Sequence, residues 1–218
     1  MANIQLYHFS ASPPCRSVRM AAKALGVQLE LKQLDFANKE HLNPEFLKIN
    51  PDQIVPTMTD GDFTLWESRA IMRYLVGKYG GEDNSLYPRD LQKRAEVDRL
   101  LDYDLGVFYR AMLETLMWPV RNRSTPTKEQ QEQVVKAFNR INTLLKDKKF
   151  LTGDNVTIAD FAMVVGFAAE FLFQGNMSDY PNAMAWYKRM QELPYYQEVN
   201  QAFYDIVEKM RNPPAEKS

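Results

Sequence analysis

The sequence predicts an α/β domain followed by an all-helical domain. Near the N-terminus, apolar residues alternate with polar ones, whereas beyond residue 90 an apolar face recurs every three or four residues. The stretch from Gly80-Gly81 to SLYPRD separates the two patterns. The 218 residues are 45% hydrophobic, which suffices for one or two compact cores. We therefore predict domains at residues 1–82 and 91–218, joined by a linker at 83–90.

Five segments define the first domain. Residues 4–9 alternate as a strand does, and residues 15–25 present one apolar helical face before Gly26 ends the helix. Residues 27–31 predict a second strand, which pairs in parallel with the first because a helix lies between them. The pair Asp60-Gly61 within residues 55–65 favours a hairpin, and residues 68–79 predict the last helix. The order βαβ, irregular segment, ββα is that of a thioredoxin-like domain.

The second domain is predicted to be helical throughout. One apolar stripe runs from Val97 to Trp118, and further helices are expected at 128–146, 157–173, 181–193 and 195–210. Thr157 and Asp160 have the spacing of a capping box, with Asp in place of the usual Glu or Gln. The most apolar stretch, residues 161–173, is too short to span a bilayer and predicts a buried helix.

Composition excludes several classes of function. With 27 Lys and Arg against 28 Asp and Glu, the net charge is -1, so nucleic acid and anionic membranes are unlikely partners. Cys15 is the single cysteine and there are two histidines, which excludes an internal disulfide and disfavours a structural zinc site. The N-terminal residues read as a strand and lack the features of a secretory signal, so we expect a cytoplasmic protein.

The loop after the first strand contains the first candidate for chemistry. In a thioredoxin-like domain this loop presents the reactive group at a helix N-terminus, and here it reads Ser12-Pro13-Pro14-Cys15. A dithiol oxidoreductase needs a low-pKa cysteine at the first of these positions, which Ser12 occupies. A hydroxyl there can instead donate a hydrogen bond to a thiolate from another molecule and lower its pKa. A helix-capping role for Ser12 is the alternative. Cys15, at the fourth position, is expected to be buried.

The whole chain resembles the cytosolic glutathione transferases of insects. The resemblance lies in SPPCRSV, EHLNPEFLKINP, IVPT, WESRAI, KYG followed by SLYP, TIADF and LPYYQE. SPPCR and LPYYQE are similar to the epsilon class, whereas LWESRAI is similar to the delta class. The resemblance implies the glutathione transferase fold, and it implies that glutathione is a co-substrate with no permanently bound cofactor or metal.

The resemblance also implies a role for each glutathione contact. Ser12 matches the serine that hydrogen-bonds the thiolate, and Ser10 is a nearby alternative. Pro56 matches a cis-proline, beside which Val55 offers its N–H and C=O to the cysteinyl part. Ser68 and its helix N-terminus match the γ-glutamyl carboxylate contact, although Ser68 could be only an N-cap. The remaining expected contacts are Glu67 and Arg69 at the γ-glutamyl end, with an exposed Arg69 as the alternative, and His41 and Gln53 near the glycyl carboxylate. Ile54 is a further expected glutathione contact.

The electrophile is expected to bind against the second domain. The resemblance places Tyr109, Met112 and Leu116 in a hydrophobic substrate site with Phe203 from the last helix, although each could equally belong to the core. The resulting prediction is a glutathione transferase that conjugates hydrophobic electrophiles in detoxification and forms a homodimer. One alternative is a non-catalytic ligand-binding or interaction module of the same fold. Another is a cysteine-type thiol transferase or dehydroascorbate reductase, which Ser12 in the nucleophile position disfavours.

Overall fold

The computed structural model describes residues 4–211, which group by their internal contacts into two units. The first unit joins the chain up to Leu75 with the C-terminal residues from Leu193 onward, and the second runs from Val76 to Glu192. The last helix, which the sequence analysis assigns to the second domain, thus groups with the first unit. In the described part of the chain, no helix is long and apolar enough to cross a membrane.

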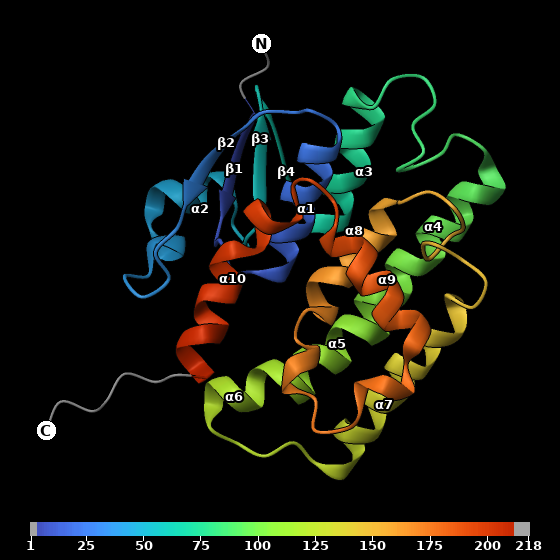
Figure 1. The fold of residues 1–218 in the computed structure, drawn as a ribbon. Coiled ribbons are helices and arrows are strands. Elements are labelled where there is room, and N and C mark those ends of the chain that lie inside the picture. Colours follow the sequence, from blue (N-terminus) through green and yellow to red (C-terminus); the bar gives the residue numbers. More distant parts are fainter. Residues whose placement is uncertain (1–3, 212–218) are drawn as a thin grey trace, which may run out of the picture. The chain divides into compact units, whose positions relative to one another are not determined.

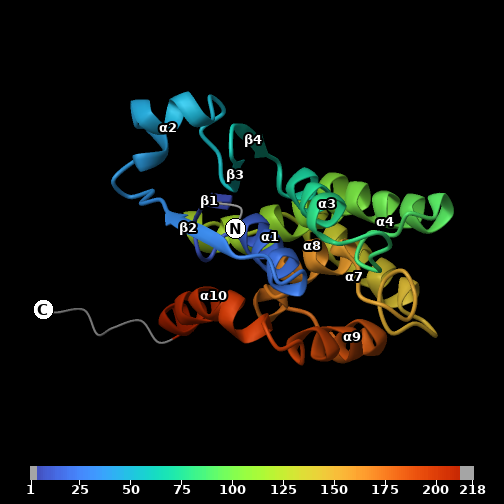
Figure 2. The ribbon, with the colours of Figure 1, turned by 90° about the horizontal axis from the view of Figure 1, so that it is seen from above.

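The first unit contains a four-stranded mixed sheet with the strand order β2-β1-β3-β4. Strand β1 pairs in parallel with β2, as predicted, and antiparallel with β3. Figure 2 shows α1 and α2 on opposite sides of this sheet. The elements are β1 (Ile4–His8), α1 (Pro13–Ala24), β2 (Leu29–Gln33), η1 (Glu40–Leu42), α2 (Pro44–Ile49), β3 (Thr57–Asp60), β4 (Phe63–Trp66), α10 (Tyr196–Arg211) and the part of α3 (Ser68–Tyr79) up to Leu75.

Alternation along β1 explains why its two faces pack against different elements. Ile4, Leu6 and His8 are buried, whereas the intervening Gln5 and Tyr7 are half-buried. Because successive side chains point to opposite faces, Tyr7 reaches the side of the sheet that the buried residues do not. There its ring packs at 5.5 Å from that of Phe46 in α2. Helix α2 lies in the segment predicted to be irregular, because a helix of about one and a half turns is too short to show periodicity.

The hairpin between β3 and β4 closes one residue later than expected. Asp60 pairs with Phe63, so the two loop residues are Gly61 and Asp62, not Asp60 and Gly61. Gly61 has a φ of +61°, a left-handed conformation that glycine adopts without steric cost. The same pairing aligns Thr57 with Trp66. The residues that precede β3 and those that follow β4 therefore lie at one end of the hairpin.

The second unit consists of helices arranged around α8 (Ile158–Phe167) (Figure 1). All ten residues of α8 are buried. A helix that is apolar on every side belongs in a core. The predicted long stripe forms a run of helix interrupted by two π-helical stretches. The other elements are α4 (Leu91–Tyr103), η2 (Asp104–Phe108), α5 (Tyr109–Met112), η3 (Leu113–Met117), α6 (Trp118–Asn122), α7 (Lys128–Leu144), η4 (Glu170–Leu172), η5 (Met177–Asp179) and α9 (Pro181–Gln191).

Asp160 anchors the start of α8. Its carboxylate accepts hydrogen bonds from the Thr157 N–H at 2.9 Å, as the capping-box spacing predicts, and from the Leu151 N–H and the Trp186 indole N–H. Burial raises the pKa of this carboxyl group, and the hydrogen bonds that it accepts oppose the rise. Four donors from three separate segments thus converge on one side chain once the Thr157 hydroxyl is included.

Candidate active site

Three segments of the first unit meet at one edge of the sheet. Tyr7 pairs with Thr57, and Thr57 pairs with Trp66. Because β1 and β3 are antiparallel, β1 ends where β3 begins, and β4 also ends there. This edge therefore brings together the loop after β1, which holds Ser12, the loop before β3 and the first residues of α3. The topology thereby gathers the predicted thiolate, cysteinyl and γ-glutamyl contacts.

Ser12 occupies the N-cap position of α1 with extended backbone angles, φ -63° and ψ 125°. Its N–H donates to the Phe9 carbonyl at 2.9 Å, and its carbonyl accepts from the Arg16 N–H. Its hydroxyl makes no capping hydrogen bond, so the capping role is not what this side chain performs. Pro13 and Pro14 open the helix without N–H groups, which reduces the number of amide donors that its N-terminus offers to an anion.

Cys15 is fully buried in α1, as expected. Burial raises the pKa of its thiol, and a hydrogen bond with the Ser12 side chain opposes that rise only in part. The thiol is therefore protonated at neutral pH and is a packing group. Ser10, the alternative to Ser12, is engaged elsewhere, because its hydroxyl donates to the Gln33 side chain.

The loop before β3 is organised by a residue that the sequence analysis does not single out. Asn50 is fully buried, and its amide donates to the Thr57 hydroxyl at 2.8 Å and to the Ile54 carbonyl at 3.2 Å. Its side-chain oxygen accepts from the Asp52 N–H at 2.9 Å. This is an Asx turn, for which the Asn-Pro-Asp sequence is a recognisable signal. The buried amide holds the predicted Gln53–Pro56 contacts in one conformation.

The backbone of Val55 is available for pairing. The peptide bond between Val55 and Pro56 is cis, as the resemblance implies. Among residues 4–211, neither the N–H nor the C=O of Val55 has a hydrogen-bond partner. Backbone groups of this kind require a partner, which a ligand or water can supply. An extended peptide ligand would find one donor and one acceptor here.

Glu67 and Gln53 both have left-handed backbones. Glu67 has a φ of +69° and Gln53 a φ of +60°, a conformation that is costly for residues with a Cβ. The Glu67 side chain is exposed immediately before α3, and its carbonyl accepts from the Ile71 N–H at 2.9 Å. Trp66, at the end of β4, connects the turn before α3 to the loop before β3, because its indole N–H donates to the Asp52 carboxylate at 2.8 Å.

Ser68 and Arg69 form the first turn of α3. Ser68 is the first helical residue, so the N-cap position belongs to Glu67 and not to Ser68. Ser68 is buried, with 3% of its surface exposed. Arg69 is 8% exposed, which rules out the alternative of an exposed arginine. The Arg69 guanidinium donates to the Ser68 hydroxyl at 3.3 Å. The turn thus presents a buried cation and a hydroxyl beside the exposed Glu67 carboxylate.

His41 stacks on an aromatic neighbour. Its ring lies 4.4 Å from that of Phe36 at an interplanar angle of 18°, and Phe36 meets Phe9 edge-on at 5.8 Å. The His41 Nδ1 atom is buried without a hydrogen-bond partner among the described residues. Sequence reasoning identifies neither aromatic neighbour.

The predicted electrophile residues of the second unit lie in different surroundings. Tyr109 and Met112 approach α8 at Gly166, where an added Cβ would lie 3.7 and 3.8 Å from their side chains. Leu116 instead lines a hollow of about 270 Å³ with Thr115, Val135 and other residues. A core role for Tyr109 and Met112, the alternative in the sequence analysis, fits this packing.

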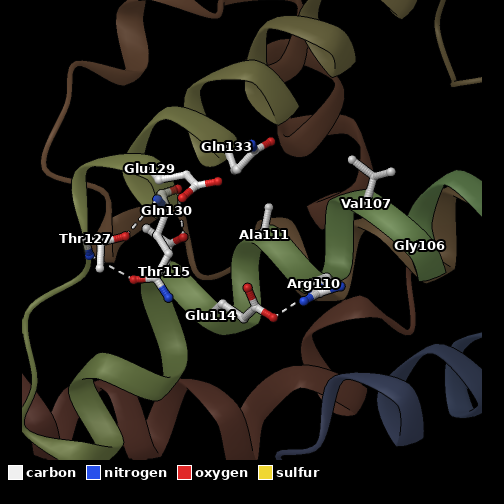
Figure 3. A pocket seen from close by; sticks show the side chains of 10 residues that line it. All are labelled: Gly106, Val107, Arg110, Ala111, Glu114, Thr115, Thr127, Glu129, Gln130 and Gln133. Carbon is white, nitrogen blue, oxygen red and sulfur yellow. Dashed lines mark hydrogen bonds and ion pairs between the residues drawn. The ribbon is translucent and has the colours of Figure 1, made fainter.

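A larger hollow of about 520 Å³ lies between α5 and the start of α7 (Figure 3). Its walls carry the ion pair between Arg110 and Glu114 and the Thr127–Gln130 capping contact. It includes none of the predicted electrophile residues, and its charged lining does not suit a hydrophobic substrate. Among the described residues, no group of three or more His, Cys, Asp or Glu side chains could hold a metal ion.

Comparisons with known proteins identify the family to which this chain is similar. Residues 2–77 match the N-terminal domain model of glutathione S-transferases and residues 107–194 match the C-terminal one. Glutathione S-transferase D7 of Drosophila melanogaster is 38% identical over 188 residues, covering 86% of this chain and 84% of that protein.

Two solved structures have nearly the same fold. An epsilon-class glutathione S-transferase from the housefly, Musca domestica, has a TM-score of 0.88 and 36% identity over 96% of this chain and 98% of its own. A glutathione transferase homologue from Drosophila mojavensis, with bound glutathione, has a TM-score of 0.87 and 34% identity over 98% and 99%. The chain belongs to the glutathione S-transferase family. Its fold is accordingly the glutathione transferase fold that the sequence predicts.

Proposed function

We propose that this protein is a glutathione transferase that conjugates glutathione to hydrophobic electrophiles. The observation that carries the proposal is the hydroxyl of Ser12, which makes no capping bond and lies at the same sheet edge as the unpaired backbone of Val55. Glutathione is the co-substrate, and no permanently bound cofactor is required. The protein is proposed to act as a cytoplasmic homodimer in detoxification.

Each glutathione segment has a proposed contact. Val55 pairs its N–H and C=O with the cysteinyl part, as an added strand does. Glu67 accepts from the γ-glutamyl ammonium, while Ser68 and Arg69 hold the γ-glutamyl carboxylate. His41 and Gln53 contact the glycyl carboxylate, and Ile54 is a further glutathione contact.

The chemical step follows from the Ser12 hydroxyl. Free thiols have a pKa near ~8.5, so most glutathione is protonated at neutral pH unless the site favours the thiolate. Ser12 donates a hydrogen bond to the sulfur and keeps its own proton, while the thiol proton is released to water. The thiolate then forms a carbon–sulfur bond with the electrophile. In substitution the leaving group departs with its electron pair, and in addition the resulting carbanion takes a proton from water.

The test is the pH profile of turnover in Ser12→Ala. A charge-assisted hydrogen bond is worth roughly 1.5–3 kcal/mol, so its loss should raise the pKa of the bound thiol by about one to two units. Turnover with an aryl halide should fall at neutral pH and recover in alkali, while the KM for glutathione changes little. Ser10→Ala is the matched control and should keep the wild-type profile.

Two results would count against the proposal. An unshifted profile in Ser12→Ala would mean that another group stabilises the thiolate. A wild-type protein that binds immobilised glutathione but shows no transfer to any electrophile would indicate the non-catalytic binding module instead.

A further inference from the structure

Helix α1 presents three basic side chains to the first turns of α10. Arg16, Arg19 and Lys23 recur at helical spacing and therefore lie on one face. Lys23 forms an ion pair with Glu198 at 2.7 Å, and Arg19 donates to the Val199 carbonyl at 3.3 Å. The Lys23 pair is exposed, and exposed pairs contribute little to stability. The specific connection between the helices therefore lies with Arg16.

Arg16 is fully buried and has two distinct contacts on α10. Its Nη1 donates to the Asn200 side-chain oxygen at 2.6 Å, and its guanidinium carbon lies 4.2 Å from the centre of the Phe203 ring. Asn200 is itself held in place, because its amide donates to the Tyr196 carbonyl at 2.8 Å. A planar guanidinium can stack on a ring and donate in its own plane at once, which an ammonium cannot do. The Arg16 guanidinium thus contacts Asn200 and the Phe203 ring at the same time.

The position of Arg16 relates this ring to the thiolate donor. Arg16 follows Ser12 by four residues on the same helix, and its backbone N–H donates to the Ser12 carbonyl at 3.0 Å. Helical side chains lean toward the helix N-terminus, so the Arg16 side chain covers the turn that begins at Ser12. Phe203, which packs on the guanidinium, is therefore held beside that turn. Its ring is only half-buried.

We propose that Arg16 is a positioning residue for electrophile selectivity: it holds the Phe203 ring so that flat aromatic electrophiles stack beside the thiolate. The inference rests on the proposed transferase function and adds to it a residue that touches neither substrate. Thiolate formation stays with Ser12. Small aliphatic electrophiles offer no π-face to the ring and gain nothing from its orientation.

The experiment compares Arg16→Lys and Phe203→Leu with the matched control Lys23→Met. Arg16→Lys keeps the charge but removes the planar contact with the ring. Both test variants should lower kcat/KM for chlorodinitrobenzene about tenfold and leave kcat/KM for acrolein within twofold of wild type. The KM for glutathione and the pH profile should stay unchanged. The double variant should lose no more than either single variant, since both remove one interaction, and Lys23→Met should retain the wild-type selectivity.

Several outcomes would overturn the inference. An equal loss for both electrophiles, or additive losses in the double variant, would show a general structural role. A shifted pH profile in Arg16→Lys would show that the cation acts on the thiolate instead. If Arg16→Lys does not fold, unchanged selectivity in Phe203→Leu still refutes the proposal. If the wild type shows no transfer, the proposed function fails, and equal affinity of wild type and Arg16→Lys for chlorodinitrobenzene alone would separately refute the positioning role.

Discussion

The left-handed backbone at Glu67 predicts that one substitution will strengthen the fold and weaken glutathione binding. A residue with a Cβ costs about 1–2 kcal/mol at a φ of +69°, and glycine removes this cost. Glycine also has more conformational entropy to lose on folding, roughly 0.5–1 kcal/mol. The Glu67 side chain is exposed and makes no hydrogen bond with described residues, so little packing is lost. Glu67→Gly should therefore raise the free energy of unfolding by about 0.5–1 kcal/mol.

The same variant should bind glutathione less well, because the γ-glutamyl ammonium loses its acceptor. A charge-assisted hydrogen bond of about 1.5 kcal/mol corresponds to roughly a tenfold increase in KM. Glu67→Gln separates the two effects, since it retains the backbone cost but removes the charge. It should show a raised KM without a gain in stability.

Arg123→Gly is the control for the backbone term. Arg123 is exposed, has a φ of +51° at the end of α6 and belongs to the second unit. The Arg123→Gly variant should gain a similar amount of stability and keep the wild-type KM for glutathione. Urea unfolding and steady-state kinetics give the two quantities. A Glu67→Gly protein that is less stable than wild type, or whose KM is unchanged, would refute the reasoning.

Three further predictions follow from other residues. Gln53→His should lower the KM for glutathione modestly, because an imidazole directs a better donor to the glycyl carboxylate than an amide does; an equal or higher KM would contradict this. Tyr109→Ala and Met112→Ala should lower stability and leave the ranking of electrophiles unchanged, as their packing against Gly166 implies; a changed ranking at constant glutathione KM would instead assign both residues to the substrate site. Burial, together with the nearby Arg19 charge, lowers the pKa of His8 to about 4; the unfolded chain therefore binds this proton more tightly, and stability is lost as pH falls from about 6.5 toward 4. Between pH 7 and 5 the free energy of unfolding, measured with urea, should fall by roughly 2 kcal/mol in the wild type and by much less in His8→Leu. An equal fall in both proteins would show that His8 is not the titrating group.

Sequence reasoning performs best where a pattern is long or a motif is specific. It predicts the parallel pairing of β1 with β2, the bounds of α3 and the four helices that follow the long stripe, because those segments have clear periodicity and end signals. The helix predicted at 157–173 is too long, since α8 ends at Phe167. It places the Ser12, Val55 and Glu67 segments in one site only through the family resemblance. The strand register then gives a physical reason for their proximity, since Tyr7, Thr57 and Trp66 are paired across one edge.

What the sequence misses depends on tertiary contacts. The short helix α2 has no period to detect, and the hairpin loop shifts by one residue because pairing of Asp60 with Phe63 overrides the turn propensity. The burial of Arg69 and the stacking of His41 on Phe36 depend on neighbouring side chains in the folded structure. No sequence motif marks those neighbours. The predicted linker at residues 83–90 stays a prediction.

The contact between Arg16 and Asn200 joins residues 184 positions apart, and this separation has a consequence for synthesis. Domains generally fold as units while the chain emerges, with the N-terminal domain first. Here the sheet and α1 are made early, but α10 is made last. Until α10 is released, the Arg16 guanidinium has neither Asn200 nor the Phe203 ring to pack against. The part of this protein that is translated first is therefore the part that is finished last.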